Sequence, residues 1–323
     1  MFRSSLRSFL ALFVACTALM APASAGAATV VNGDFETGTL SGWQVFNSSD
    51  RGNWFVYSGV FTPFDGEKVE PFFPPPQGIF AAVTDESNPD TAILSQEIAL
   101  EPFWTHQLAL TLYYRSRAPI VVPNPNTLAS NGTVEENQQL RVDVMRAGTP
   151  IESLNPADIL ATVFANRTGD PQQMLPTLFT VDLSPFAGQV VKLRIANAVQ
   201  DNVFNAGVDG VSITSTPPSN AITRGKLTLN KSNGTGKLAV TVPGPGTLVA
   251  TGKGNKKKVR RVSRLAAAAG TIKLPLNPNG AGKKVLDASG KLKTRIGVTF
   301  TPTGGTAATK TYKVTLKKTL KTK

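Results

Sequence analysis

The segment 53–80 holds the side chains best suited to contact a sugar. It is rich in aromatic rings, and the strongest candidates for a ligand surface are Trp54, Tyr57, Phe72 and Phe73. Carbohydrate sites place aromatic faces against the C–H surfaces of a sugar and use charged or amide groups for its hydroxyls. Those polar contacts could come from Arg115, and also from Asp65, Glu67 and Arg117. The pattern predicts a binding surface for a polysaccharide or glycan and does not indicate which sugar.

The same rings have a second interpretation, in which they hold a long proline-rich loop against a β-sandwich. In a strand over 54–57, Trp54 and Val56 would share one face, and Phe55 and Tyr57 the other. At least one of these pairs is expected in the core. The sequence alone leaves both interpretations open.

Side chains for catalysis are scarce. A Ser-His-Asp site needs a histidine, and the chain has only His106. No Gly-x-Ser-x-Gly motif and no Cys/His cluster for zinc accompany it. Glu135 and Glu136 are neighbours and would point to opposite faces of a strand, which suits the paired carboxylates of a glycosidase poorly. The sequence favours a noncatalytic protein, and a weak hydrolase is the remaining alternative of this kind.

Both halves of the chain show the period-two alternation of half-buried strands. The clearest runs are 108–112, 140–144 and 191–195 in the first half, and 238–242, 272–276, 292–300 and 312–316 in the second. Helical turns are expected only within 155–166 and 277–291. About seven short strands over roughly 100 residues in the second half suit an Ig-like sandwich. The chain is therefore predicted to be all-β, with two sandwiches.

Charge divides the chain near "TSTPPSN", 214–220. Residues 28–217 hold 9 Lys and Arg against 20 Asp and Glu, a net of −11, whereas 218–323 hold 23 Lys and Arg against one acid, Asp287, a net of +22. Prolines and small polar residues suit a linker at this point. The predicted organisation is a signal peptide over 1–27, a domain over 28–216, a linker over 217–222 and a basic domain over 223–323.

The basic half predicts attachment by charge. Besides the dense run 253–264, it places Lys293, Arg295, Lys313 and Lys317 in alternation with apolar residues, so they should coat a solvent face. With one acid there is little internal pairing, and self-repulsion favours an anionic partner. Because the protein is expected to be exported, an anionic cell-wall polymer, an acidic polysaccharide or lipid headgroups are the expected targets. A merely solubilising surface is the alternative.

Nucleic acid is not expected as a partner of the basic half. Its only aromatic residues are Phe300 and Tyr312, both on the apolar faces of their strands, so it lacks a stacking platform. This half resembles the Lys-rich, Gly/Thr-rich β modules at the ends of bacterial surface proteins.

The stretch "VVNGDFETGTLSGW", 30–43, opens the predicted first domain. Its Asn32-Gly33-Asp34-Phe35-Glu36, followed by a glycine-containing turn and Gly42-Trp43, resembles the first strand of galactose-binding-like jelly rolls. These β-sandwiches occur in many carbohydrate-binding modules and bacterial surface proteins. The resemblance continues through 92–100, 106–115, 179–195 and 207–214. It implies a carbohydrate-binding or adhesive jelly roll, with Phe35 and Trp43 as apolar anchors.

The resemblance also implies a structural calcium ion. In that family a glutamate of the first strand and an aspartate near the last strand often bind Ca²⁺, and Glu36 and Asp209 hold the matching positions. Calcium takes six to eight oxygens, and backbone carbonyls near Gly33 could supply several. Such an ion would tie the first strand to the last. The alternative is two solvated acids at strand ends.

The first residues indicate export. Arg3 and Arg7 precede an apolar run over 9–20, and two small-x-small patterns follow, Ala23-Ser24-Ala25 and Ala25-Gly26-Ala27. This is typical of a secretory signal peptide and too short to span a bilayer. Cys16 is an alternative lipid-attachment site. Because it is the only cysteine, the mature chain is expected to lack disulfides. No later segment is long and apolar enough to span a membrane.

Together these observations predict a secreted, noncatalytic envelope protein. Its acidic domain would bind carbohydrate, and its basic domain would hold an anionic surface. The rival hypothesis is a structural matrix protein whose oppositely charged domains associate between copies.

Overall fold

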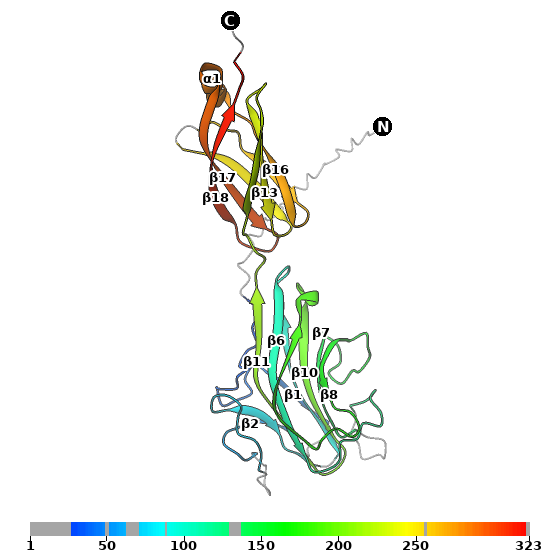
Figure 1. The fold of residues 1–323 in the computed structure, drawn as a ribbon. Helices are drawn as coiled ribbons and strands as arrows, with labels where there is room; N and C mark the ends of the chain where they lie inside the picture. The colour runs from blue at the N-terminus through cyan, green and yellow to red at the C-terminus, as the bar shows by residue number, and fades with distance from the viewer. Residues whose placement is uncertain are drawn as a thin grey trace, which may run out of the picture.

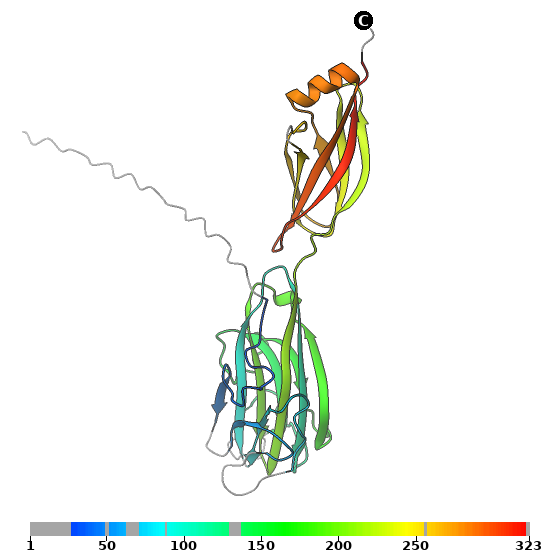
Figure 2. The same cartoon turned by 90° about the vertical axis from the view of Figure 1, so that its left-hand side faces the viewer.

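The computed structural model describes residues 27–48, 52–62, 71–87, 89–128, 137–254 and 257–320. Strands dominate these residues, and the helices among them are one α-helix and one short 3-10 helix, Ser184–Phe186. Two antiparallel sandwiches follow one another along the chain, as Figures 1 and 2 show. The all-β prediction is confirmed. Most of the predicted signal peptide with Cys16, and the residues Asp65, Glu67, Glu135 and Glu136, lie outside the described ranges.

The N-terminal sandwich is a jelly roll of two sheets. One sheet has the order β1 (Gln44–Asn47), β5 (Asp90–Ala99), β10 (Val190–Val199), β7 (Gln139–Arg146) and β8 (Ile159–Ala165). The other has the order β2 (Trp54–Tyr57), β3 (Ala81–Thr84), β11 (Val203–Thr216), β6 (Thr105–Ser116) and β9 (Gln173–Asp182), with β4 (Glu86–Ser87) also paired to β11. Successive strands mostly cross from one sheet to the other, which distinguishes this topology from a stack of hairpins.

The core of the N-terminal sandwich lies between its sheets. The predicted alternating runs supply it: Leu108, Leu110 and Leu112 from β6, Leu140, Val142 and Val144 from β7, and Val191, Leu193 and Ile195 from β10. All of these side chains are buried. Apolar residues at every second position thus place one face of each strand in the core, as the sequence predicts.

The outer face of the β5–β10–β7 region is covered rather than open to solvent. Arg194 on β10 and Asp143 on β7 are both fully buried, and their Nη2 and Oδ2 atoms lie 2.6 Å apart. The Arg194 guanidinium also donates to the carbonyls of Ile151 and Ser153 in the loop that follows β7. Burial lowers the pKa of Arg194, which the neighbouring Asp143 charge opposes. Arg194 therefore joins β10 to β7 through the ion pair and holds the covering loop through its hydrogen bonds.

Two local expectations for the first half are corrected. Residues 159–165 form strand β8 rather than a helical turn, because they pair with β7 along its length. Residues 31–37 form turns rather than a first strand, because Asn32 and Phe35 adopt positive φ values of 49° and 56°, which a strand does not contain. The first strand, β1, begins only at Gln44.

The C-terminal sandwich contains seven strands. One sheet has the order β12 (Thr223–Asn230), β13 (Thr235–Val242) and β16 (Gly270–Leu276). The other has the order β15 (Val262–Ala266), β14 (Gly246–Lys253), β17 (Lys291–Pro302) and β18 (Ala308–Lys317). Immunoglobulin-like sandwiches also divide seven strands between two antiparallel sheets. This sandwich has its own core, separate from that of the first.

The predicted helical turn within 277–291 is confirmed as α1 (Gly280–Ser289). Asn279 caps its start by accepting from the Gly282 amide, and Gly290 ends it with a left-handed φ of 67°. Leu286 is the buried contact of the helix with the core. No helix in the described ranges is long and apolar enough to cross a membrane.

Candidate ligand-binding and metal sites

Residues 30–43 are held as a compact turn by their own side chains. The Asn32 amide donates to the carbonyls of Thr39 and Ser41, at 2.7 and 3.1 Å, and the Trp43 indole donates to the Asn32 carbonyl at 3.1 Å. The rings of Phe35 and Trp43 stack with centroids 5.5 Å apart, and Phe35 is fully buried. Both rings are apolar anchors, as predicted. This turn fixes where Glu36 points.

Glu36 and Asp209 both bind the segment 77–80. Glu36 Oε1 accepts from the amides of Ile79 and Phe80 at 2.8 and 2.9 Å. Asp209 Oδ2 accepts from the Gln77 amide at 3.0 Å, and its Oδ1 accepts from the Gly210 amide at 2.6 Å. The two carboxylates predicted to share an ion are therefore brought to the same segment.

The two carboxylates differ in burial. Asp209 is fully buried in β11, whereas Glu36 is exposed. Burial raises the pKa of Asp209 to about 6, against the opposing effect of its hydrogen bonds to Gln77 and Gly210, and the Glu36 charge raises it further. Among the described residues, neither acid forms an ion pair with Lys, Arg or His. A cation beside them would relieve this repulsion.

The donor set fits calcium in kind. Carboxylate and carbonyl oxygens are the hard ligands that Ca²⁺ prefers, and it needs six to eight of them. No group of three or more His, Cys, Asp or Glu side chains in the described residues could hold a metal, so backbone carbonyls or water would have to complete the shell. The Gly33 carbonyl accepts from the Val211 amide at 2.8 Å, which joins the first turn to β11 without an ion.

The structure buries most of the aromatic candidates. Trp54 is 2 % exposed and packs with Val56 in the core between the sheets, which confirms that this pair faces inward. Tyr57 is 4 % exposed and Phe72 is 8 % exposed, and both pack with Tyr113 on the opposite face of the sheet. A ring enclosed in this way offers no face for a sugar. The prediction that Trp54, Tyr57 and Phe72 form a ligand surface is therefore corrected.

The buried Tyr57 hydroxyl is fully hydrogen-bonded. It donates to the Phe73 carbonyl at 2.8 Å and lies 2.8 Å from the Tyr113 hydroxyl, which must then be the donor in that pair. Burial raises the pKa of both tyrosines, so both hydroxyls keep their protons. The cluster fixes the segment around 72–73 against the sheet.

What remains accessible here is a small surface around Pro71. Phe73 is half-buried, Arg115 is exposed, and Phe61, which pairs with Pro71 in a β-bridge, is 52 % exposed. Arg115 Nη1 donates to the Pro71 carbonyl at 3.1 Å. We call Phe61, Phe73 and Arg115 the Pro71 patch. The ligand role predicted for Phe73 and Arg115 stays a prediction.

A polar cleft at the edge strand β8 is a site that the sequence did not reveal. It has a volume of about 650 Å³. Its polar lining includes Gln139, Arg141, Thr162, Asn166, Arg167 and Asp170. Phe164 also borders it, with its ring packed against Tyr114 and Phe179 of the core. We call it the β8 cleft; β7 and β8 are labelled side by side in Figure 1. Its residues come from the segment before β7, from β7, from β8 and from the turn after β8, so no local motif marks it.

Hydrogen bonds to neighbouring residues fix the positions of several side chains of the β8 cleft. Arg141 Nε donates to Asp143 Oδ2 at 2.7 Å, and its Nη2 donates to Thr162 at 3.3 Å. The Asn166 amide donates to the Tyr114 hydroxyl at 3.0 Å and to Asp170 at 3.3 Å. A guanidinium has five N–H donors in a fixed fork, so Arg141 retains donors for a ligand.

His106 is buried and structural in its contacts. Its Nε2 lies 2.9 Å from the Glu101 carbonyl, an acceptor, so Nε2 carries a proton. Its Nδ1 lies 2.9 Å from the Ser215 hydroxyl and 3.9 Å from the Glu101 carboxylate. A catalytic triad needs the serine and the carboxylate on different ring nitrogens, whereas both lie at Nδ1 here. The arrangement is not a triad.

Comparison with protein-family models finds no match, and comparison with curated proteins finds none either. Among solved structures, TmCBM61 in complex with β-1,4-galactotriose is 12 % identical, with a TM-score of 0.36 over 57 % of this chain and 96 % of that one. The K3 cleaved adhesin domain of Lys-gingipain from Porphyromonas gingivalis w83 is 17 % identical, with a TM-score of 0.35 over 58 % and 98 %. The adhesin domain of Epf from Streptococcus pyogenes is 11 % identical, with a TM-score of 0.34 over 91 % and 97 %. These similarities are too distant to assign a ligand or an activity to this chain.

Proposed function

We propose that this chain is a secreted, noncatalytic envelope protein that binds carbohydrate through its N-terminal sandwich and attaches to an anionic polymer through its C-terminal sandwich. The observation that carries the carbohydrate role is the β8 cleft. It gathers the arginine and amide groups of Arg141, Asn166 and Arg167 in a volume of about 650 Å³. The volumes of small-ligand sites run from about 300 to 1,000 Å³, and their few polar groups fix the orientation of the ligand.

The position of β8 at the sheet edge adds to this argument. β8 pairs with β7 on one side, and no described strand pairs with its other side, so one row of its backbone N–H and C=O groups has no partner strand among the residues described. Such groups bond hydroxyls as well as they bond peptide groups. Arg167 is exposed at the cleft, so a ligand can reach it without unfolding the edge.

Substitutions can show whether the β8 cleft or the Pro71 patch binds the glycan. Arg167→Ala removes an exposed guanidinium from the cleft, and Arg141→Lys keeps the positive charge beside Asp143 while removing the planar fork. Arg115→Ala makes the matched change at the Pro71 patch. Titration calorimetry measures the glycan affinity of each variant. We expect the affinity to fall about tenfold with either cleft variant, through the loss of one charge-assisted bond, and to be unchanged with Arg115→Ala. The opposite pattern would assign the ligand to the patch.

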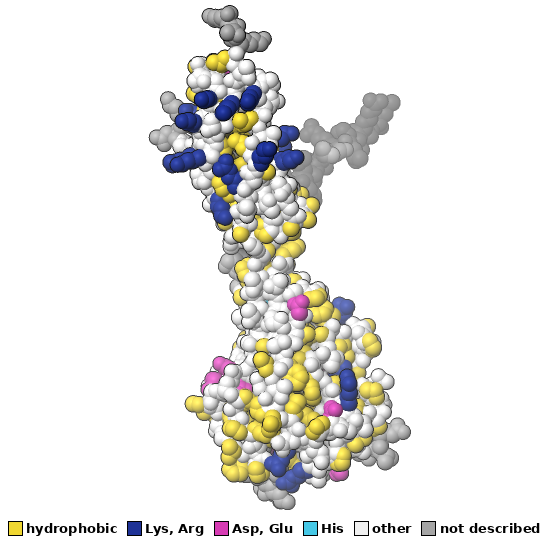
Figure 3. Space-filling view, in the orientation of Figure 1, with side chains coloured by type: hydrophobic (Ala, Val, Ile, Leu, Met, Phe, Trp, Pro, Cys, Tyr) yellow, Lys and Arg dark blue, Asp and Glu magenta, His cyan; other side chains and the backbone are white. Residues whose placement is uncertain are grey.

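The attachment role is supported by a row of like charges on the C-terminal sandwich. Lys253, Arg295 and Lys313 are aligned across β14, β17 and β18, and all three are exposed. Like charges opposite each other on a sheet repel, which an anionic polymer would offset. Figure 3 shows lysine and arginine side chains gathered over this sandwich. We call these three residues the basic row.

Ca²⁺ bound by Glu36 and Asp209 belongs to this proposal as a structural ion. Support comes from the buried Asp209 carboxylate, the repulsion from Glu36 and the lack of an ion pair for either among the residues described. When bound, the ion would link the first turn and β11 to the segment 77–80.

The matrix hypothesis remains the second candidate, because the charges of the two sandwiches are opposite. Residues 28–217 have a net charge of −11 and residues 218–323 a net charge of +22. Copies of the chain would then associate through unlike sandwiches. Analytical ultracentrifugation across a salt series tests this: association at low salt that disappears at moderate salt favours the matrix, and a monomer throughout favours attachment to another polymer.

A further inference from the structure

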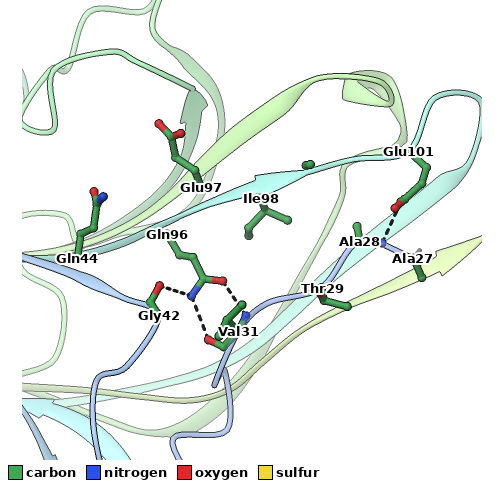
Figure 4. Close-up of a pocket in the computed structure, with 11 residues that line it drawn as sticks. Ala27, Ala28, Thr29, Val31, Gly42, Gln44, Gln96, Glu97, Ile98 and Glu101 are labelled. Atoms are coloured by element: carbon green, nitrogen blue, oxygen red, sulfur yellow. Dashed lines mark hydrogen bonds between the residues drawn. The ribbon is translucent and has the colours of Figure 1, made fainter. Parts of the chain in front are cut away.

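Residues 27–31 are bound to the N-terminal sandwich by side chains of β5 and of the loop after it. The Val31 amide donates to Gln96 Oε1 at 2.7 Å, and the Gln96 amide donates back to the Val31 carbonyl at 3.0 Å. The Ala28 amide donates to Glu101 Oε2 at 2.9 Å. Figure 4 shows these bonds among the residues that line a pocket of about 450 Å³. The backbone nitrogens of Ala28 and Val31 are thus both bonded to side chains of the sandwich.

Glu101 is a buried carboxylate without a full positive charge beside it. Its side chain is 8 % exposed. His106 Nδ1 lies 3.9 Å from this carboxylate, beyond hydrogen-bond distance, and lies closer to the Ser215 hydroxyl, at 2.9 Å. The other ring nitrogen of His106, Nε2, bonds the Glu101 carbonyl, so no hydrogen bond joins the ring to the Glu101 carboxylate. A buried carboxylate is stable only when a cation or several donors compensate it.

The other charged groups at the pocket do not compensate Glu101. Glu97 also lines the pocket, and its partner is Lys192, with Nζ and Oε1 3.8 Å apart. No Lys or Arg forms an ion pair with Glu101 among the residues that the structure describes. One nitrogen therefore faces the carboxylate closely, that of Ala28.

We propose that hydrolysis of the Ala27–Ala28 peptide bond during export creates an α-ammonium group that Glu101 binds as a buried ion pair. The inference rests on the proposed export. Water supplies the hydroxyl that completes the Ala27 carboxyl group and the hydrogen that completes the Ala28 amine, which then takes a proton from solvent. The protease is of the class that cleaves after small-x-small patterns, here Ala25-Gly26-Ala27.

The ion pair of the Ala28 ammonium with Glu101 forms with only one of the two cleavage patterns of the predicted signal peptide. Cleavage after Ala27 places the new charge on the nitrogen that already lies 2.9 Å from Glu101. Cleavage after Ala25 would leave Gly26 and Ala27 in front, and the Ala28 nitrogen would remain an uncharged amide. An ammonium donor adds a full positive charge opposite the carboxylate, which an amide donor lacks. Processing at Ala27 would therefore stabilise the fold, and processing at Ala25 would not.

The test compares mature chains that start at Ala28 with a free amine or with an acetylated one. Acetylation restores an uncharged amide at the same nitrogen and changes nothing else. It is expected to lower the folding equilibrium constant of the wild type about tenfold, which corresponds to one pKa unit of attraction between the ammonium and the carboxylate. In Glu101→Gln the effect of acetylation should be lost, whereas in Glu97→Gln, which changes the same pocket, it should persist.

A second test uses only the wild-type protein, so it does not depend on whether a variant folds. It measures the pKa of the α-amine by NMR. This pKa should lie above the range of about 7.7 to 8.0 seen for unperturbed chain termini. An unshifted α-amine, or an acetylation effect that is equal in wild type and Glu101→Gln, would overturn the ion pair. Mass spectrometry of the exported protein should find Ala28 as its first residue. A first residue of Gly26 would overturn this inference alone, whereas an intact leader would also contradict the proposed export.

Discussion

Glu36 and Asp209 are 173 positions apart in the sequence and bind neighbouring backbone amides of one segment, 77–80. Glu36 accepts from Ile79 and Phe80, and Asp209 accepts from Gln77. Gly78 lies between these amides, and a Cβ there would be 2.1 Å from Glu36 Oε1. The contact with Glu36 and a φ of 63° therefore require a glycine at 78. The two acids bring the first turn, the segment 77–80 and β11 together.

If the two acids also hold Ca²⁺, the stability of the chain depends on the ion. At a hundredfold excess over Kd, bound Ca²⁺ should add about 2.7 kcal/mol to the free energy of unfolding, which corresponds to a rise of roughly 5 to 10 °C in melting temperature. Scanning calorimetry with Ca²⁺ and with chelator measures this. Asp209→Asn should lose the response, and Glu152→Gln, an exposed acid in the loop after β7, should keep it. A wild-type melting curve that neither condition moves would exclude the metal.

Without metal, Asp209 gives stability a distinct pH dependence. Its folded pKa is raised to about 6 from 3.8, so the folded state binds the proton more tightly than the unfolded state. Stability relative to Asp209→Asn should therefore be highest below about pH 4 and fall as pH rises to about 6, by up to about 2 kcal/mol after allowance for solvent screening. Denaturant unfolding of both proteins in chelator, from pH 4 to 7, measures the difference. A difference that stays constant with pH would show that the carboxyl is not perturbed.

The buried rings should affect folding rather than binding. Trp54→Ala is expected to lower the free energy of unfolding by about 3 to 5 kcal/mol, because it leaves a cavity between the sheets. Tyr57→Phe should lower it by about 1 kcal/mol, through loss of the hydroxyl pair with Tyr113. Phe73→Ala, at a half-buried ring, serves as the milder comparison. Chemical denaturation measures all three. If Trp54→Ala kept the stability of the wild type and lost glycan binding, Trp54 would belong to the ligand site after all.

The basic row should bind anionic wall polymer in a salt-dependent way. Changing Lys253, Arg295 and Lys313 to glutamine should weaken binding to isolated cell wall and flatten its salt dependence, because exposed charges are screened beyond about 8 Å at physiological ionic strength. The control changes Lys226, Lys237 and Lys273, which lie on the other sheet, and removes the same total charge. Co-sedimentation across a salt series measures both. Wall binding that ignores salt would contradict an electrostatic account.

The sequence predicted most of the fold because the signal is local. Leu108, Leu110 and Leu112 alternate within one strand, and the polar stretch after Pro278 carries its own helix cap, Asn279. Strand β8 was missed at 155–166 because an edge strand with half-buried residues on both faces has no clean alternation. The first turn was expected as a strand because the stretch 32–36 resembles the first strand of a known family. The sequence did not indicate the positive φ at Phe35, which is rare for an aromatic residue.

The binding sites were harder to predict than the strands. The pairing of Glu36 with Asp209 at one segment came from a family resemblance and not from spacing. Whether a ring such as Tyr57 faces solvent depends on Tyr113, which lies 56 positions away, so the aromatic composition of 53–80 could not decide it. The β8 cleft joins Arg141 with Asp170 across a strand pair and a turn, and no single stretch contains it.

Binding to a glycan array most directly tests the central claim, that the N-terminal sandwich binds carbohydrate. The mature chain, applied with Ca²⁺ at physiological salt beside its Arg167→Ala variant, should bind a defined set of glycans that includes neutral ones. This binding should persist at high salt, because a cleft that recognises hydroxyls depends on hydrogen bonds rather than on net charge, and it should be about tenfold weaker in Arg167→Ala. An array without binding above background, or with binding only to acidic glycans that disappears at high salt, would contradict the account.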